Sequence, residues 1–229
     1  MGIHPLFPFR RALYGAQSVL QRGALSRGPH RPQVALTFDD GPDPRWTGAI
    51  AEILARHGAR ASFFMVGEQV ERHPELARDV VRQGHEPCVH LYSHRSEVAD
   101  DPARFEREVR DSVALITRVT GRSPTFLRFP FAHLGAQRPR RIERRFGLAT
   151  VHWSFSSLDT RLRADRIARR VRRRLFPGAI VLLHDGVGRG SMLAADRRET
   201  VRALPEIVEA CLLSRLRPVC LSSLFRSEP

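Results

Sequence analysis

The stretch Val34-Ala35-Leu36-Thr37-Phe38-Asp39-Asp40-Gly41-Pro42 gives the clearest structural signal in this sequence of 229 residues. Its first five residues have the apolar pattern of a buried β-strand, which ends at two adjacent carboxylates and a Gly-Pro turn. Two such carboxylates repel each other and cost stability unless a cation or a proton lies between them. Taken alone, the pattern also fits a turn whose acids cap the next helix. The rest of the chain must therefore distinguish a metal site from a turn.

Short apolar runs alternate with amphipathic segments along the chain. The runs at 61–66, 148–153, 179–183 and 218–221 predict strands, and the spacing of apolar residues predicts helices at 46–57, 102–119, 163–175 and 198–213. We find no internal repeat or linker that would divide them. This alternation predicts an α/β fold with a mostly parallel sheet, open or closed as a barrel. With 42% hydrophobic residues, the chain can build a core in one domain.

Residues 1–32 differ from the rest because they contain five Arg and no acidic residue. We therefore divide the chain into a basic N-terminal arm, 1–32, and a folded domain, 33–225. The arm fits peripheral contact with an anionic membrane surface, although a disordered or packed extension is the favoured interpretation. Without a signal-peptide pattern or a membrane-spanning apolar run, we expect a cytoplasmic protein, with membrane-peripheral attachment as the alternative. The sequence does not determine the oligomeric state.

The charge of the chain is strongly one-sided. It contains 38 basic residues, all of them Arg, against 24 acidic ones, for a formal net charge of +14. The lack of Lys indicates a bias in coding composition rather than a nucleic-acid surface, and no basic motif is interleaved with aromatic residues, so we expect no nucleic-acid partner. Two dense clusters, 138–145 and 161–174, fit solvated helix faces or contact with an anionic glycan or lipid. The three Cys residues lack the spacing of a disulfide scaffold or a thiolate zinc site.

Uncommon polar residues follow the predicted strands one after another. Asp39 and Asp40 follow the first strand, His90 and His94 the third, and later strand ends are followed by Arg128, Asp159 and His184. In (β/α) barrels, active sites are assembled at the carboxyl ends of the strands. His90 and His94 can share one ion, and Asp40 completes a His-His-Asp set typical of catalytic Zn²⁺. We predict one divalent metal ion there, Zn²⁺ first, with Co²⁺ or Ni²⁺ as alternatives.

The remaining polar residues suit the hydrolysis of an acyl group. Asp39, free of the metal, can act as general base towards an attacking water, with Arg128 beside it to favour its charged form. His184 can protonate the leaving group, while Asp159 holds that imidazole and raises its pKa. The metal and a backbone N–H would stabilise the oxyanion.

In order and spacing, these residues resemble the polysaccharide deacetylases that share the NodB homology domain (carbohydrate esterase family 4). The resemblance covers about 33–225 and rests on five motifs, at 37–41, 90–94, 128–131, 153–159 and 182–184. It implies that 33–225 is the catalytic domain, an α/β fold that forms a distorted (β/α) barrel of the NodB/polysaccharide deacetylase type. It also implies the roles given above for base, acid and metal ligands. In addition, it places Phe131 and Trp153 in the walls of the substrate groove and Leu182 in the pocket for the acetyl methyl group.

For function, the resemblance implies a metal-dependent hydrolase of linear amide C–N bonds other than peptide bonds. Its substrate would be an N-acetylated glycan or amino sugar, from which it removes the acetyl groups of N-acetylglucosamine-type units, as in chitooligosaccharide or peptidoglycan. One alternative is a deacylase of a lipid-linked or small-molecule amino sugar, which the basic arm and an incomplete aromatic wall favour. A catalytically silent glycan-binding domain is the less favoured alternative.

Departures from the family motifs concern the metal-ligand loop and the groove. Leu91 stands where the family has Ser or Thr, and Phe131-Ala132 where it has Tyr then Gly. Ser156 and Thr160 replace an Asp and a Trp. Because every metal ligand and proton-transfer residue is retained, we expect an active enzyme whose groove is altered.

Overall fold

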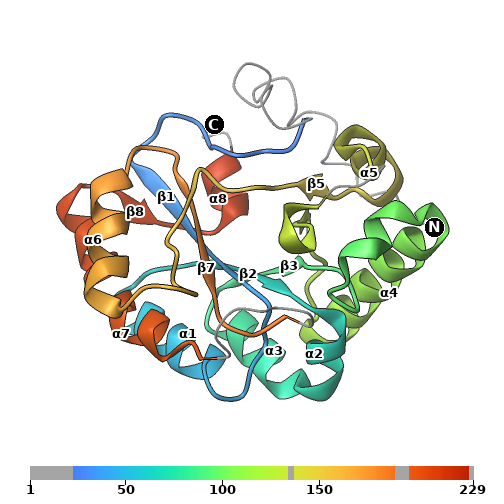
Figure 1. Ribbon diagram of the computed structural model, residues 1–229, viewed down its shortest axis with the longest axis horizontal. Helices are drawn as coiled ribbons and strands as arrows, with labels where there is room; N and C mark the ends of the chain where they lie inside the picture. Colours follow the sequence, from blue (N-terminus) through green and yellow to red (C-terminus); the bar gives the residue numbers. More distant parts are fainter. Residues whose placement is uncertain (1–22, 134–136, 189–195, 227–229) are drawn as a thin grey trace.

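The computed structural model describes residues 23–133, 137–188 and 196–226. Within them, parallel strands form one curled sheet in the order β5-β4-β3-β2-β1-β7-β6, and β8 also pairs with β1 (Figure 1). The strands are β1 (Gln33–Asp39), β2 (Ser62–Met65), β3 (Glu86–Val89), β4 (Phe126–Leu127), β5 (Ala149–Thr150), β6 (Phe155–Ser156), β7 (Ile180–His184) and β8 (Arg217–Pro218). The distorted (β/α) barrel expected from the sequence is confirmed.

Helices pack on the outer side of the sheet, except the last one, which covers an apolar cluster on the inner face (Figure 1). They are α1 (Thr47–Arg56), α2 (Gly67–Arg72), α3 (Pro74–Arg82), α4 (Pro102–Thr120), α5 (Pro139–Phe146), α6 (Ala164–Arg174), α7 (Arg198–Leu213) and α8 (Leu221–Phe225), with short 3₁₀ turns at Ser96–Asp100 and Pro130–Ala132. The longest, α4, has clear end signals. Asp101 accepts hydrogen bonds of 3.0 Å from the N–H groups of Ala103 and Arg104, and Gly121 ends the helix at φ 69°.

Alternation along β1 separates the side chains of the sheet into two faces. Val34, Leu36 and Phe38 point outward into the large core between sheet and helices. Ala35 points inward, into a smaller cluster that α8 covers with Leu221, Leu224 and Phe225. Asp39, four residues after Ala35, follows the same alternation toward the inner face. The interior of the barrel is therefore apolar where the strands begin and polar where they end.

Strand β7 repeats this arrangement beside β1. Asp39 is the register partner of His184, and Thr37 is the partner of Leu182. Val181 and Leu183 belong to the outer core, whereas Leu182 is buried on the inner face and belongs to neither apolar cluster. The two central strands thus bring an acid and a histidine, distant in sequence, to adjacent positions.

Two predicted strands are shorter than expected. Of 148–153, only Ala149–Thr150 forms a strand, followed by an isolated pairing of Val151 with Leu25. The run 218–221 ends early because the Leu221 N–H donates to Ser62 Oγ at 2.9 Å and the chain turns into α8. The predicted helices at 102–119 and 198–213 correspond to α4 and α7.

The last part of the predicted arm lies against the barrel. Leu25 bridges to Val151, and the Gly28 N–H donates to the Gly178 carbonyl at 2.8 Å. Residues 1–22 lie outside the described residues, so membrane contact through the arm stays a prediction. Among the described helices, none combines the length and the apolar composition needed to cross a bilayer.

Candidate active site and metal centre

Left-handed backbone conformations gather where the strands end. Asp40 has φ 81°, which turns its side chain to the same side as that of Asp39 instead of the opposite face. The same region holds further non-glycine residues at positive φ, namely Leu91, His94, Phe131, Ala132 and Leu158. Such conformations cost energy and persist where the surrounding structure imposes them, often at functional sites.

The three predicted metal ligands lie together. The ligand atoms of Asp40, His90 and His94 are all within 4.8 Å of one another, and all three residues are buried. Asp40 Oδ1 is 2.9 Å from His94 Nε2 and 3.4 Å from His90 Nε2. Burial opposes ionisation of Asp40, but hydrogen bonds with both imidazoles hold its pKa well below the ordinary value.

The protonation of His90 suits a metal ligand. Its Nδ1 lies 2.9 Å from the carbonyl oxygen of Arg128, which can only accept a hydrogen bond, so Nδ1 carries the hydrogen. In the neutral imidazole, Nε2 is then the atom whose lone pair can bind a cation, and it lies 3.4 Å from Asp40 Oδ1. Backbone carbonyls commonly orient metal-binding histidines in this way. A buried carboxylate and two imidazoles therefore fit a divalent cation such as Zn²⁺.

Arg128 is fully buried and holds Asp39. Its Nη1 donates to Asp39 Oδ1 at 2.6 Å and to Thr37 Oγ1 at 2.9 Å, and its Nη2 donates to the His152 carbonyl at 2.9 Å. The guanidinium carbon lies 4.0 Å from the ring centroid of Phe64. With Oδ1 held by Arg128, the other oxygen of Asp39 faces His90, at 3.8 Å from Nε2.

His184 forms a second charged pair with Asp159. Its Nδ1 is 2.9 Å from Asp159 Oδ1, and its backbone N–H donates to Asp159 Oδ2 at 2.8 Å. Burial alone would lower the pKa of His184, but the charge and hydrogen bonds of Asp159 outweigh it and raise the pKa to about 9. The imidazolium can therefore act as a proton donor at neutral pH.

Two hydroxyl groups that the sequence analysis did not single out support this pair. Thr200 Oγ1 donates to Asp159 Oδ2 at 2.9 Å, and Ser157 Oγ donates to Asp159 Oδ1 at 3.1 Å. Burial opposes ionisation of Asp159, yet His184 and the Thr200 hydroxyl keep its pKa below the ordinary value. Nothing in the sequence marks Thr200, because it comes from α7 and only the folded chain brings it here.

Asp185 is a buried acid that the sequence analysis also missed. Its carboxylate accepts from Thr47 Oγ1 at 2.6 Å and from the Gly41 N–H at 3.2 Å, which joins the loop after β7 to the loop after β1. Burial raises its pKa to about 7, and the nearby charges of Asp40 and Asp39 add to the effect. A side chain at position 41 would overlap the Asp185 carboxylate, so only glycine fits there. The one sequence signal was its position directly after His184.

The three predicted groove residues occupy different places. Phe131 is 53% exposed, and its ring centroid lies 4.9 Å from that of His94, at the rim of the site. Leu182 lies deeper, on the inner face of β7. Trp153 is partly buried with the Arg128 guanidinium 5.7 Å from its ring. Leu91 is buried in the outer core, so this departure from the family motif adds no side chain to the groove.

The chain is similar in sequence to known proteins of one family. The family model described as polysaccharide deacetylase matches residues 26–151. A chitooligosaccharide deacetylase of Bradyrhizobium sp. (strain ANU 289) is 37% identical over 77% of this chain and 83% of that protein. A peptidoglycan-N-acetylglucosamine deacetylase of Bacillus cereus is 30% identical over 87% of this chain and 71% of that protein. The chain belongs to the polysaccharide deacetylase family.

A solved structure agrees with this assignment. The crystal structure of the Bc1960 peptidoglycan N-acetylglucosamine deacetylase superposes with a TM-score of 0.81 at 28% sequence identity. The match covers 90% of this chain and 94% of that chain.

Proposed function

We propose that this chain is a metal-dependent hydrolase that removes N-acetyl groups from N-acetylglucosamine-type units of a glycan or oligosaccharide. The observation that supports this best is that one buried site contains both a set of metal ligands and a pair of proton-transfer groups. One is the Asp40-His90-His94 ligand set, and the other is the pair of proton-transfer groups, Asp39 and His184, that flanks it. A domain that only bound glycan would need neither a base nor an acid.

Asp40, His90 and His94 would hold the cation, for which we propose Zn²⁺. When bound, a divalent cation lowers the pKa of water and polarises a carbonyl group. The Arg128 carbonyl orients His90, and contact with Asp40 orients His94.

Asp39 is proposed to accept a proton from the attacking water through Oδ2, since Oδ1 is held by Arg128. His184 would donate its Nε2 proton to the departing amine of the sugar, because Nδ1 is engaged by Asp159. These steps break the amide C–N bond and leave acetate and a free amino sugar. Phe131, Trp153 and Leu182 are proposed to line the groove, with Leu182 beside the acetyl methyl group.

The test is acetate release by the purified, metal-loaded chain from chitooligosaccharides, from peptidoglycan fragments and from a lipid-linked N-acetylated amino sugar. Turnover of either of the first two supports the proposal. Turnover of the lipid-linked sugar alone would replace it by the alternative deacylase. A chain that binds no divalent ion and releases no acetate from any of the three would be a silent glycan-binding domain.

A further inference from the structure

The two ends of the barrel differ in charge. All strands run parallel, so the segments that lead into them lie at one end, which we call the strand-entry face. None of the described segments 23–32, 57–61, 83–85, 121–125, 147–148, 175–179 and 214–216 contains an Asp or a Glu. By contrast, the loops at the opposite end mix both signs of charge, with Asp40, Asp43, Asp159 and Asp185 beside Arg45, Arg161 and Arg163. The strand-entry face is therefore basic, and the active site lies away from it.

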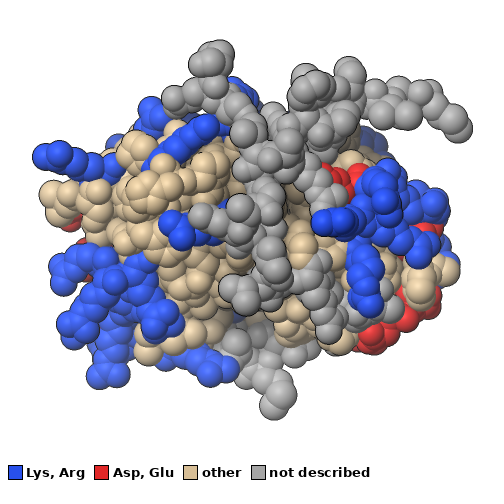
Figure 2. All heavy atoms as spheres, turned by 90° about the horizontal axis from the view of Figure 1, so that it is seen from above, with Lys and Arg blue, Asp and Glu red and all other residues tan. Residues whose placement is uncertain are grey.

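The last turn of α6 adds the densest charge to this face. Arg172, Arg173 and Arg174 are all exposed, and the structure pairs none of them with a carboxylate among the described residues. One cation near the end of a helix would suffice to complement its dipole. Figure 2 shows basic side chains gathered on the side where Figure 1 draws α6, with few acidic ones among them.

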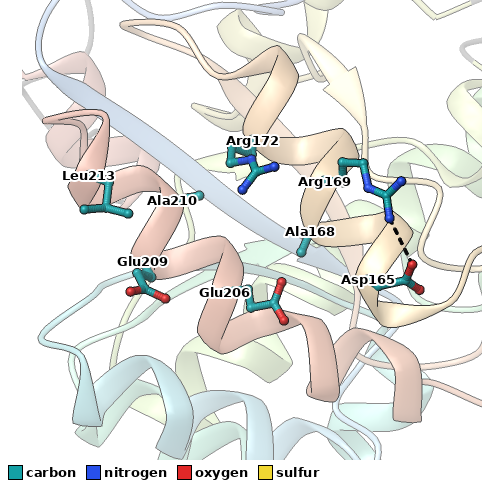
Figure 3. A pocket seen from close by; sticks show the side chains of 8 residues that line it. All are labelled: Asp165, Ala168, Arg169, Arg172, Glu206, Glu209, Ala210 and Leu213. Atoms are coloured by element: carbon teal, nitrogen blue, oxygen red, sulfur yellow. Dashed lines mark hydrogen bonds and ion pairs between the residues drawn. The ribbon is translucent and has the colours of Figure 1, made fainter.

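An exposed leucine of α7 lines the same groove as Arg172 of α6. Leu213 is 78% exposed and Leu212 is 49% exposed, at the end of α7 that leads into β8. Arg172 and Leu213 line the same groove between α6 and α7, of about 490 Å³, together with Glu206 and Glu209 on α7 (Figure 3). Together these two leucines form a small exposed apolar patch at the end of α7.

We propose that the strand-entry face docks on an anionic phospholipid membrane through Arg172–Arg174 and the leucines at the end of α7. Guanidinium groups at a membrane surface bind lipid phosphates, and neighbouring leucines enter the boundary between headgroups and acyl chains. A soluble polyanion would use the arginines but gain nothing from the leucines, so the combination favours a lipid surface. Docking in this orientation leaves the active site facing away from the bilayer, open to a glycan.

The experiment is co-sedimentation of the full chain with vesicles of equimolar phosphatidylglycerol and phosphatidylcholine, and with vesicles of phosphatidylcholine alone. We expect binding to the first only. Replacing all three arginines (R172Q/R173Q/R174Q) should weaken binding about 100-fold, since each arginine near an anionic surface contributes roughly fivefold. Leu213→Ser should weaken vesicle binding about fivefold but leave binding to heparin, a soluble polyanion, unchanged.

The matched control removes the same charge elsewhere, with R107Q/R110Q/R141Q on exposed positions of α4 and α5. This control variant should bind vesicles within about twofold of the unchanged protein. All variants should keep the circular dichroism spectrum of the unchanged protein. Equal losses in the two triple variants would overturn the proposal, because net charge alone would then explain binding. Vesicle binding by R172Q/R173Q/R174Q as tight as that of the unchanged protein would also overturn it. If Leu213→Ser bound vesicles as tightly as the unchanged protein, the face would be a general polyanion surface instead.

Discussion

Arg128 contacts both halves of the site, because its guanidinium donates to Asp39 at 2.6 Å while its carbonyl oxygen accepts from His90 Nδ1 at 2.9 Å. One buried residue thus orients the proposed base and one proposed metal ligand. The two-residue strand β4 comes directly before Arg128 and pairs with β3 on one side and with β5 on the other.

Loss of the base should separate catalysis from metal binding. Asp39→Asn keeps the shape of the side chain but cannot accept the proton, so we expect turnover to fall about 1,000-fold. Metal content by mass spectrometry should stay near one ion per chain. Asp43→Asn, in the same loop but paired with Arg45, should keep near-normal turnover. Retained activity in Asp39→Asn would mean that another group is the base.

The alkaline limb of the pH profile should report His184. The imidazole is active as acid only while protonated, so kcat/KM should fall as pH rises through its pKa of about 9. In Asp159→Asn the raising charge is gone and burial still lowers the pKa, so the limb should move to lower pH. Thr200→Val removes only one donor to Asp159 and should shift the limb less. An unchanged limb in Asp159→Asn would contradict the assignment of His184.

Burial makes the Arg128–Asp39 pair more important for stability than a surface pair of equal length. Arg128→Met leaves a buried carboxylate without its partner and should lower the free energy of unfolding by about 3–5 kcal/mol. Arg145 and Glu106 are also 2.6 Å apart but exposed to solvent. Arg145→Met should therefore cost less than about 1 kcal/mol. Urea unfolding of both variants measures the difference, and similar costs would show that burial does not govern it.

A glycine should control the position of a metal ligand. A side chain at Gly188 would overlap the His94 ring, so Gly188→Ala should displace that ligand and weaken metal binding by about 10–100-fold, the range seen when a supporting contact of a metal site is lost. Gly48→Ala meets no atom within 4 Å and is the control. Calorimetric titration of the metal-free proteins with Zn²⁺ gives the affinities. Equal affinities would show that the loop simply moves aside.

Removal of the proposed ligands should abolish metal binding itself. His90→Ala or His94→Ala should reduce affinity by more than the 10–100-fold that follows loss of an outer partner. His152, which is buried nearby with its pKa lowered to about 4 by burial, is not in the ligand set, and His152→Ala should retain the ion. If His152→Ala lost the ion as well, the ligand set would be incomplete.

The sequence alone predicted the parallel α/β fold and the Asp-His-His set. Both follow from local patterns, since alternating apolar runs require strands and helices, and polar residues directly after strands must meet at one edge of a parallel sheet. The short elements were less predictable. The run 148–153 is paired only at Ala149–Thr150 and Val151, because its extent depends on which neighbouring strand is present. The roles of the individual groove residues also stay predictions.

Only the tertiary structure shows which residues hold the side chains of the site in place. Thr200 reaches Asp159 from α7, and Asp185 joins the loops after β1 and β7. These contacts link residues far apart in the chain, and no local pattern encodes them. The sequence likewise shows that Arg is abundant, but not how the arginines are distributed over the surface of the folded chain. Only the parallel sheet, which places every strand-entry segment at one end, separates a face without acidic loop residues from the active site.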